Sequence, residues 1–289
     1  MTRVRILPVV LLATLSRPTM AIDIDALWNY GKPEVSEQRF AAAMDGATAD
    51  EKLVLQTQIA RTWGLRKDFA NARQILAGVE PALPNASAEV QVRHWLELGR
   101  TWISATHSKE QRTPDARQTA RDAYLRAFEL AEQARLDYLA IDALHMMAFV
   151  DDAPDQQLAW NQKAIAHMER SDQPDAKRWE GSLRNNVGYA LRLKGDYDGA
   201  LAQFRLSRAA HERMGRKKSV RIADWMIART WREQQRYTEA IALQLELERA
   251  WDADSEPDPY VFEELELLYR ATGDEARAQH YAARLKAAR

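Results

Sequence analysis

The sequence predicts an all-α solenoid of stacked antiparallel helical hairpins, and two observations support this prediction. First, the pentapeptide I-A-R-T-W occurs at Ile59–Trp63 and again at Ile227–Trp231, and a related L-G-R-T-W occurs at Leu98–Trp102. Second, apolar residues between Leu183 and Ser207 recur at the spacing of two consecutive helices. A pentapeptide that returns nearly unchanged along one chain marks an internal repeat, and internal repeats determine the architecture of a chain.

The composition is that of a folded chain without a strong electrostatic field. The 289 residues suffice for one or two globular domains or for one solenoid, and 46% of them are apolar. Only 11 glycines and 10 prolines argue against disorder and against a turn-rich all-β fold. The net charge of −1 gives no global attraction for nucleic acid, so no nucleic-acid partner is expected. The absence of cysteine excludes disulfides, thiol catalysis and cysteine-ligated metals.

Residues 1–21 have two interpretations. A basic start, the apolar stretch Ile6–Leu15 and the small residues near Ala21 fit a cleaved secretory signal peptide, which would place the protein in the periplasm or outside the cell. Alternatively, Met20 is the true start, the preceding residues are a misassigned extension, and the protein is cytoplasmic. The apolar stretch is too short to span a bilayer in either case. Residues 22–289 are expected to form one solenoid domain.

The unit at residues 183–207 shows how one hairpin is built. The apolar residues that share a helical face are Leu183, Val187 and Leu191 in the first helix, and Tyr197, Ala200, Leu201 and Phe204 in the second. Gly195 is expected to end the first helix in the left-handed conformation, and Asp196 to cap the second. The small side chains of Gly188 and Ala200 would let the two backbones approach, while Tyr197 and Phe204 fill the seam.

Over about residues 34 to 289, the chain resembles the tetratricopeptide repeat family. The small residue at the eighth position of the family signature is Ala60, Gly99, Gly188 and Ala228, with His145 and Glu266 as departures. An aromatic residue follows three positions later at Trp63, Trp102, Trp231 and Tyr269. The resemblance implies a right-handed solenoid of about six units preceded by an N-terminal half unit. The resemblance says little about activity, because one fold can serve many functions.

Several landmarks of this solenoid are expected from local signals. Pro33–Ala43 is predicted to be a lone second helix that opens the stack, and Thr48–Glu51 has the spacing of a capping box. Asp258 followed by Pro259 predicts the start of the last unit. The polar segment Ser104–Asp115 is interpreted as an insertion that forms a tolerated surface loop.

The resemblance also implies where a partner would bind. In the family, the first helices of the units line a concave groove in which extended peptides lie, and the second, fifth, sixth, ninth and twelfth positions of each first helix face that groove. The candidate binding residues at such positions are Arg61, Arg93, Arg100, Asn185, Asn186, Tyr189, Trp225, Arg229 and Arg232. Guanidinium groups would bind carboxylates, the asparagines would hold peptide backbone, and the aromatic residues would anchor apolar groups.

A simpler interpretation of the arginines is that they pair with Glu97, Asp142 or Asp224 in neighbouring helices. The tryptophans of the repeated pentapeptides, Trp63, Trp102 and Trp231, are expected to be packing residues rather than ligand contacts.

No catalytic or metal-binding pattern is present. His145 has no second histidine at metal-ligand spacing, and the acidic run from Asp252 to Glu263 has Pro257 where a calcium loop requires glycine. We therefore expect a non-enzymatic protein without metal or cofactor, a scaffold or adaptor that binds an extended acidic segment of a protein or peptide. The alternative is a regulator in which a bound peptide alters the curvature of the solenoid and so its affinity for a second protein.

Overall fold

The computed structural model describes residues 22–288, and within them it contains helices and no strands. Both interpretations of residues 1–21 concern a segment outside the described residues. The α-helices are α1 Ile24–Leu27, α2 Pro33–Ala43, α3 Ala49–Leu65, α4 Phe69–Val79, α5 Ala88–Arg100, α6 Pro114–Gln133, α7 Asp137–Val150, α8 Pro154–Arg170, α9 Glu180–Leu193, α10 Tyr197–Arg213, α11 Lys217–Glu233, α12 Tyr237–Ala253, α13 Pro259–Ala271 and α14 Glu275–Ala288. None of these described helices is long and apolar enough to cross a membrane.

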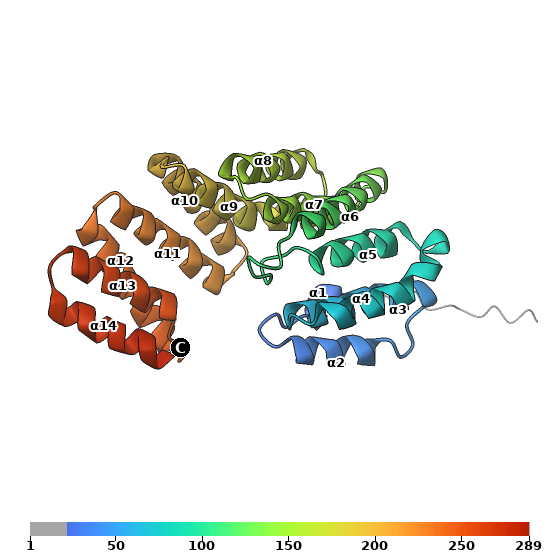
Figure 1. The fold of residues 1–289 in the computed structure, drawn as a ribbon, viewed down its shortest axis with the longest axis horizontal. Helices are drawn as coiled ribbons and strands as arrows, with labels where there is room; N and C mark the ends of the chain where they lie inside the picture. The colour runs from blue at the N-terminus through green and yellow to red at the C-terminus, as the bar shows by residue number, and fades with distance from the viewer. Residues whose placement is uncertain (1–21, 289) are drawn as a thin grey trace, which may run out of the picture.

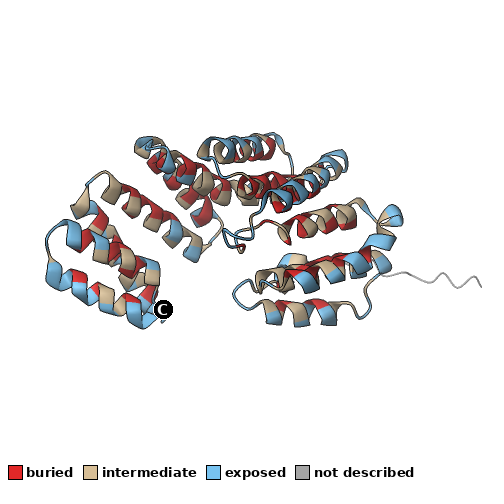
Figure 2. Ribbon diagram, in the orientation of Figure 1, coloured by how far each residue is buried: buried red, intermediate tan, exposed pale blue. Residues whose placement is uncertain are grey.

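The helices form a solenoid in which each packs mainly on its neighbours in the chain. After α2, six antiparallel hairpins follow, from α3 and α4 to α13 and α14, and together they make an arch (Figure 1). Buried residues line the surfaces between successive helices, whereas the outer helices are exposed on their far sides (Figure 2). This arrangement confirms the predicted six units after an N-terminal half unit.

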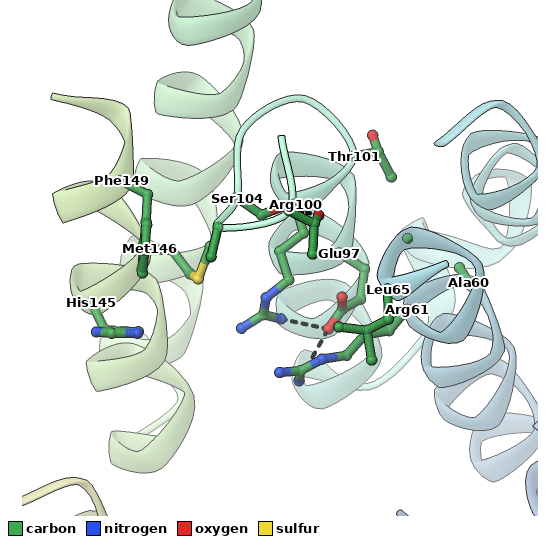
Figure 3. A pocket seen from close by; sticks show the side chains of 13 residues that line it. Ala60, Arg61, Leu65, Glu97, Arg100, Thr101, Ser104, His145, Met146 and Phe149 are labelled. Atoms are coloured by element: carbon green, nitrogen blue, oxygen red, sulfur yellow. Dashed lines mark hydrogen bonds and ion pairs between the residues drawn. The ribbon is translucent and has the colours of Figure 1, made fainter. Parts of the chain in front are cut away.

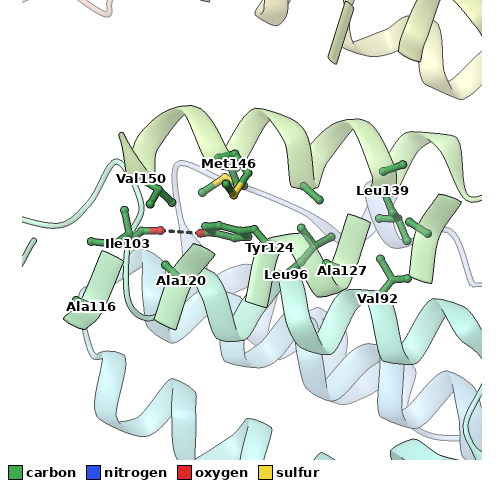
Figure 4. Packing of buried hydrophobic residues seen from close by; sticks show 14 residues of the cluster. Val92, Leu96, Ile103, Ala116, Ala120, Tyr124, Ala127, Leu139, Met146 and Val150 are labelled. Atoms are coloured by element: carbon green, nitrogen blue, oxygen red, sulfur yellow. Dashed lines mark hydrogen bonds between the residues drawn. The ribbon is translucent and has the colours of Figure 1, made fainter. Parts of the chain in front are cut away.

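Small residues in the first helices make room for aromatic rings from the second helices. A Cβ atom on Gly99 of α5 would lie 2.5 Å from the ring of Tyr124 of α6, and one on Gly188 of α9 would lie 2.6 Å from the ring of Phe204 of α10. Both rings are fully buried. Figure 4 shows Tyr124 at the centre of its cluster, where its hydroxyl donates to the Ile103 carbonyl at 2.6 Å. The small signature residues therefore set how closely the helices of a hairpin approach.

The predicted helix ends are confirmed. Thr48 and Glu51 form a reciprocal capping box at the start of α3. Gly195 has φ +79°, and the Asp196 carboxylate accepts from the Gly199 amide at 2.9 Å at the start of α10. Asp258 caps α13 in the same way, accepting from the Tyr260 amide at 2.9 Å. These interactions satisfy backbone groups that would otherwise lack partners at helix ends.

Residues 104–113 form a connection without helix between α5 and α6, and residues 108–111 are exposed, as expected for the predicted surface loop. Pro114 already begins α6, and the preceding connection is anchored to its neighbours. The His107 ring stacks on Phe69 with 3.9 Å between centroids and contacts the Thr101 carbonyl at 3.2 Å. Arg112 donates to the Phe149 carbonyl at 3.2 Å. Side-chain donors therefore satisfy carbonyls at the ends of two helices, which fixes the connection in place.

The tryptophans of the repeated pentapeptides are packing residues, as expected, and each contacts the core with one face of its ring. Trp63, Trp102 and Trp231 are half-buried against separate core clusters. An arginine guanidinium covers each ring: Arg66 lies 4.0 Å from the Trp63 centroid, and Arg73 lies 4.6 Å from that of Trp102. These tryptophans join the core to a layer of cations by cation–π contacts.

The packing of Gly188 predicts opposite effects for two glycine substitutions. Gly188→Ala should lower the free energy of unfolding by about 1–3 kcal/mol, because its methyl group would collide with the buried Phe204 ring. Gly78→Ala in α4, where a Cβ meets nothing within 4 Å, should raise it by up to about 1 kcal/mol. Urea unfolding followed by circular dichroism measures both, and a shift in the same direction for both would refute the packing argument.

Candidate functional site

Three adjoining cavities lie between the first helices of the units. The first, of about 190 Å³, has walls from Leu65, Met146 and Phe149 and a base of Arg61, Glu97 and Arg100 (Figure 3). The second, the central cavity of about 500 Å³, also includes Arg61 and is lined by residues that include Asp142, Arg178, Ser182 and Arg216. The third, of about 300 Å³, includes His145, Ser182, Asn185, Asn186 and Ile222. Because neighbouring cavities share residues, they form one groove along the first helices.

The groove floor carries polar contacts that join each first helix to the next, and we call this set the inter-unit ladder. From the first unit to the last, its pairs are Arg61 with Glu97, Arg100 with Asp142, His145 with Asn186, Arg192 with Glu233, Arg229 with Glu264, and Arg232 with Glu264. The arginines of all three R-T-W pentapeptides belong to it. Their recurrence in the sequence therefore reflects a recurrent contact between successive units.

Arg100 is an enclosed arginine of the ladder that contacts two carboxylates. Its guanidinium donates to Glu97 in α5 and to Asp142 in α7, both at 2.5 Å, and only 11% of its side chain is exposed. Figure 3 shows Arg61 and Arg100 reaching the same oxygen of Glu97, with Arg61 at the longer distance of 3.7 Å. Burial alone would raise the pKa of the Asp142 carboxyl, but the charges of Arg100 and Arg61 hold it below its ordinary value. Arg100 thus serves mainly to join α5 to α7.

The C-terminal arginines differ in how tightly they are paired. Arg232 makes a bidentate contact with Glu264, at 2.6 and 3.1 Å, and Arg192 pairs with Glu233 at 2.5 Å. Arg229 lies 3.7 Å from Glu264 and 3.8 Å from Glu233, and its Nε has no hydrogen-bond partner among the described residues. Arg229 is therefore more loosely paired than Arg192 and Arg232, and 32% of its side chain is exposed.

A neutral pair replaces the ion pair at the middle of the ladder. His145 Nδ1 lies 3.0 Å from the amide nitrogen of Asn186, so the imidazole accepts and is neutral. Burial lowers the pKa of His145 to about 4, with Asp142 opposing this shift and Arg100 reinforcing it. Protonation would place a donor against the Asn186 amide and break this contact between α7 and α9.

The remaining predicted residues have separate positions. Asn185 lines the third cavity, and its buried Oδ1 has no hydrogen-bond partner within residues 22–288. Tyr189 is 41% exposed, with the Arg192 guanidinium 4.9 Å from its ring centroid. Trp225 donates to the Tyr260 carbonyl of the next unit at 3.1 Å. Arg93 pairs within its own helix with Glu89 at 2.8 Å.

The segment before α2, residues 22–32, brings further residues into the groove, and the sequence analysis did not predict them. Asp25 and Trp28 line the central cavity together with Tyr138 and Arg178. Asp25 and Arg178 form an ion pair at 2.5 Å although 153 residues separate them in the chain. No local pattern links the two positions. The only available signal was the concentration of acidic and aromatic residues just before the first predicted helix.

The described residues provide no basis for a metal centre. Within residues 22–288, no group of three or more histidine, aspartate or glutamate side chains is arranged to hold a metal ion. The polar groups of the groove are instead arginines, carboxylates and amides. Such groups bind ligands by hydrogen bonds and ion pairs.

The fold is similar to solved structures of low sequence identity. A Signal Transduction ATPase with Numerous Domains (STAND) protein with a tetratricopeptide repeat sensor, from Pyrococcus horikoshii, matches 89% of this chain with a TM-score of 0.63 and 10% identity. The match covers only 39% of the STAND protein. RapI in its apo form matches 91% of this chain and 72% of its own, with a TM-score of 0.65 and 11% identity.

The class of protein follows from the fold. No protein-family model matches the sequence, and no curated protein matches it significantly. The six stacked hairpins and the solved structures nevertheless establish a tetratricopeptide-repeat-like helical solenoid.

The neutral state of His145 predicts a loss of stability in mild acid. The unfolded imidazole binds a proton below about pH 6.5, whereas the folded one does so only near pH 4, so stability falls as the pH drops through this window. Each such histidine contributes up to about 1.4 kcal/mol per pH unit. His94, His107 and His211, whose pKa values burial also lowers, add to the slope.

Urea unfolding at several pH values tests this contribution. Between pH 6.5 and 4, His145→Gln should reduce the slope of the free energy of unfolding against pH by the contribution of about one proton. His280→Gln, at an exposed position, should leave this slope unchanged. Equal slopes for His145→Gln and the parent would contradict the assignment.

Proposed function

We propose that this protein is a non-enzymatic interaction module that binds an extended acidic segment of a partner protein or peptide in the groove. The observation that carries the proposal is the charge balance of the ladder. Its arginines are Arg61, Arg100, Arg192, Arg229 and Arg232, and its carboxylates are Glu97, Asp142, Glu233 and Glu264. The arginines outnumber the carboxylates, so the ladder leaves positive charge to attract a carboxylate.

The loosely paired arginines are the ones suited to a ligand. Arg61 and Arg229 lie 3.7 Å from their carboxylates and keep 24% and 32% of their side chains exposed. A ligand carboxylate can approach either guanidinium without separating a short ion pair. Arg100 is unsuited to this role, because its removal would break the ion pair of the buried Asp142, leave Glu97 with only the longer contact to Arg61, and destabilise the fold.

Apolar anchors accompany the cations in the C-terminal half of the groove. Tyr189, Ile222 and Leu267, on the first helices of three successive units, are 41%, 51% and 41% exposed. Exposed apolar side chains beside cations favour a segment that carries both carboxylates and apolar groups. The amide side chain of Asn185, which lines the third cavity, would hold peptide backbone.

Selection from a random-peptide display library tests the proposal. The selected peptides should be enriched in aspartate and glutamate, and Arg229→Glu should weaken their binding about ten- to hundredfold by removing a charge-assisted hydrogen bond and adding repulsion. The matched control is Arg205→Glu, which makes the same charge change at an exposed position on α10.

Two outcomes would refute the acidic ligand: selected peptides without acidic enrichment, or equal binding to Arg229→Glu and the parent. The alternative function, regulation through curvature, shares this groove. It requires in addition that the selected peptide change the radius of gyration in small-angle scattering.

A further inference from the structure

The segment before α2 lies across the N-terminal half of the groove. Trp28 Nε1 donates to Gln58 Oε1 in α3 at 3.1 Å, and Asp25 pairs with Arg178, in the connection between α8 and α9, at 2.5 Å. The Arg61 guanidinium lies 5.4 Å from the Trp28 ring centroid and 5.5 Å from that of Tyr30. The segment thus reaches from the first unit to the connection before the fourth.

The segment combines exposed polar contacts with some apolar packing, because Ile24 packs against the buried cluster around Val54 and the Trp28 ring centroid lies 5.0 Å from that of Phe40. The four-residue helix α1 has no buried residue, and Tyr30 is 56% exposed. Arg178 and Asp25 keep 39% and 42% of their side chains exposed, and ion pairs of this exposure contribute little stability. The polar contacts of Asp25 and Trp28 with the groove are therefore side-chain contacts that water or another peptide can replace.

The groove residues that contact this segment match its chemistry one by one. Arg178 supplies a cation for the carboxylate, Gln58 accepts the indole N–H, and Arg61 lies against the aromatic rings. Tyr138 lines the cavity beside Asp25, and the Arg178 guanidinium lies 5.7 Å from its ring centroid. With the segment removed, Arg178 would keep only Asp175, at 3.8 Å, as a carboxylate partner.

We propose that Gln58, Arg61, Tyr138 and Arg178 form a binding site for a peptide that carries a carboxylate three residues before a tryptophan, and that the chain's own Asp25 and Trp28 occupy this site as a tethered competitor. The inference rests on the proposed function in placing an acidic ligand in the groove, and it adds the ligand's pattern and its regulation. A short tether gives an effective concentration in the millimolar range. An external peptide therefore binds with an affinity reduced by the fraction of time the site is open.

The test uses the full chain and a fluorescein-labelled synthetic peptide of residues 22–32, with binding measured by fluorescence polarisation. Asp25→Arg sets a cation against Arg178 and should release the tethered segment while leaving Trp28 in place. This variant should bind the labelled peptide about tenfold or more tightly than the parent does. Glu34→Arg, the same charge change at an exposed position of α2, should bind as the parent does.

A second substitution assigns the site. Adding Arg178→Ala to the Asp25→Arg variant should weaken its binding of the labelled peptide about tenfold. Replacing the aspartate and the tryptophan of that peptide by alanine should weaken its binding to the Asp25→Arg variant to a similar extent. Equal binding by Asp25→Arg and the parent, or no binding to either, would overturn the inference.

The Arg229→Glu variant separates this inference from the proposed function, because that arginine lies outside this site. It should bind the labelled peptide as the parent does. Failure of the library selection and failure of the labelled peptide would therefore be distinguishable results.

Discussion

The inter-unit ladder of arginines and carboxylates is the constraint on which the rest of the groove depends. Successive first helices meet along the groove floor, where the ladder carboxylates Glu97, Asp142 and Glu264 are buried. A polar contact at a repeated position joins these helices, and Arg100 between Glu97 and Asp142 is an enclosed example. Because such a buried pair is costly to break from one side only, the ladder also limits how the groove can vary.

The ladder determines what the groove can offer a ligand. Its carboxylates form ion pairs between units. The remaining positive charge lies on arginines whose ion-pair distances are long, such as Arg61 and Arg229. The segment that contains Asp25 and Trp28 lies against the N-terminal part of this surface, with Arg61 over the Trp28 ring. The fold and the ligand preference of the groove are thus linked. Stacking of the units sets the positions of the ladder residues, the ladder contains more arginines than carboxylates, and the loosely paired arginines suit a segment with acidic and aromatic residues.

Local signals predicted the fold well because repeats impose the same local chemistry many times. The capping box at Thr48, the left-handed Gly195 and the small Gly188 each follow from a few neighbouring residues. The candidate site was predicted only in part. Repeat position places Arg61, Arg100 and Arg229 alike, but their exposures depend on carboxylates one unit away. The contact between Asp25 and Arg178 joins distant positions and has no signature in the sequence.

Pulsed electron paramagnetic resonance can show whether the chain's own acidic segment lies in the groove. The chain has no cysteine, so spin labels at Ala26→Cys and Ala202→Cys, both exposed positions, are the only ones introduced. A segment bound in the groove should give a narrow distance distribution for this pair that becomes broad when Asp25→Arg is added. A broad distribution in the chain with native Asp25, unchanged by that substitution, would show that the segment does not lie in the groove.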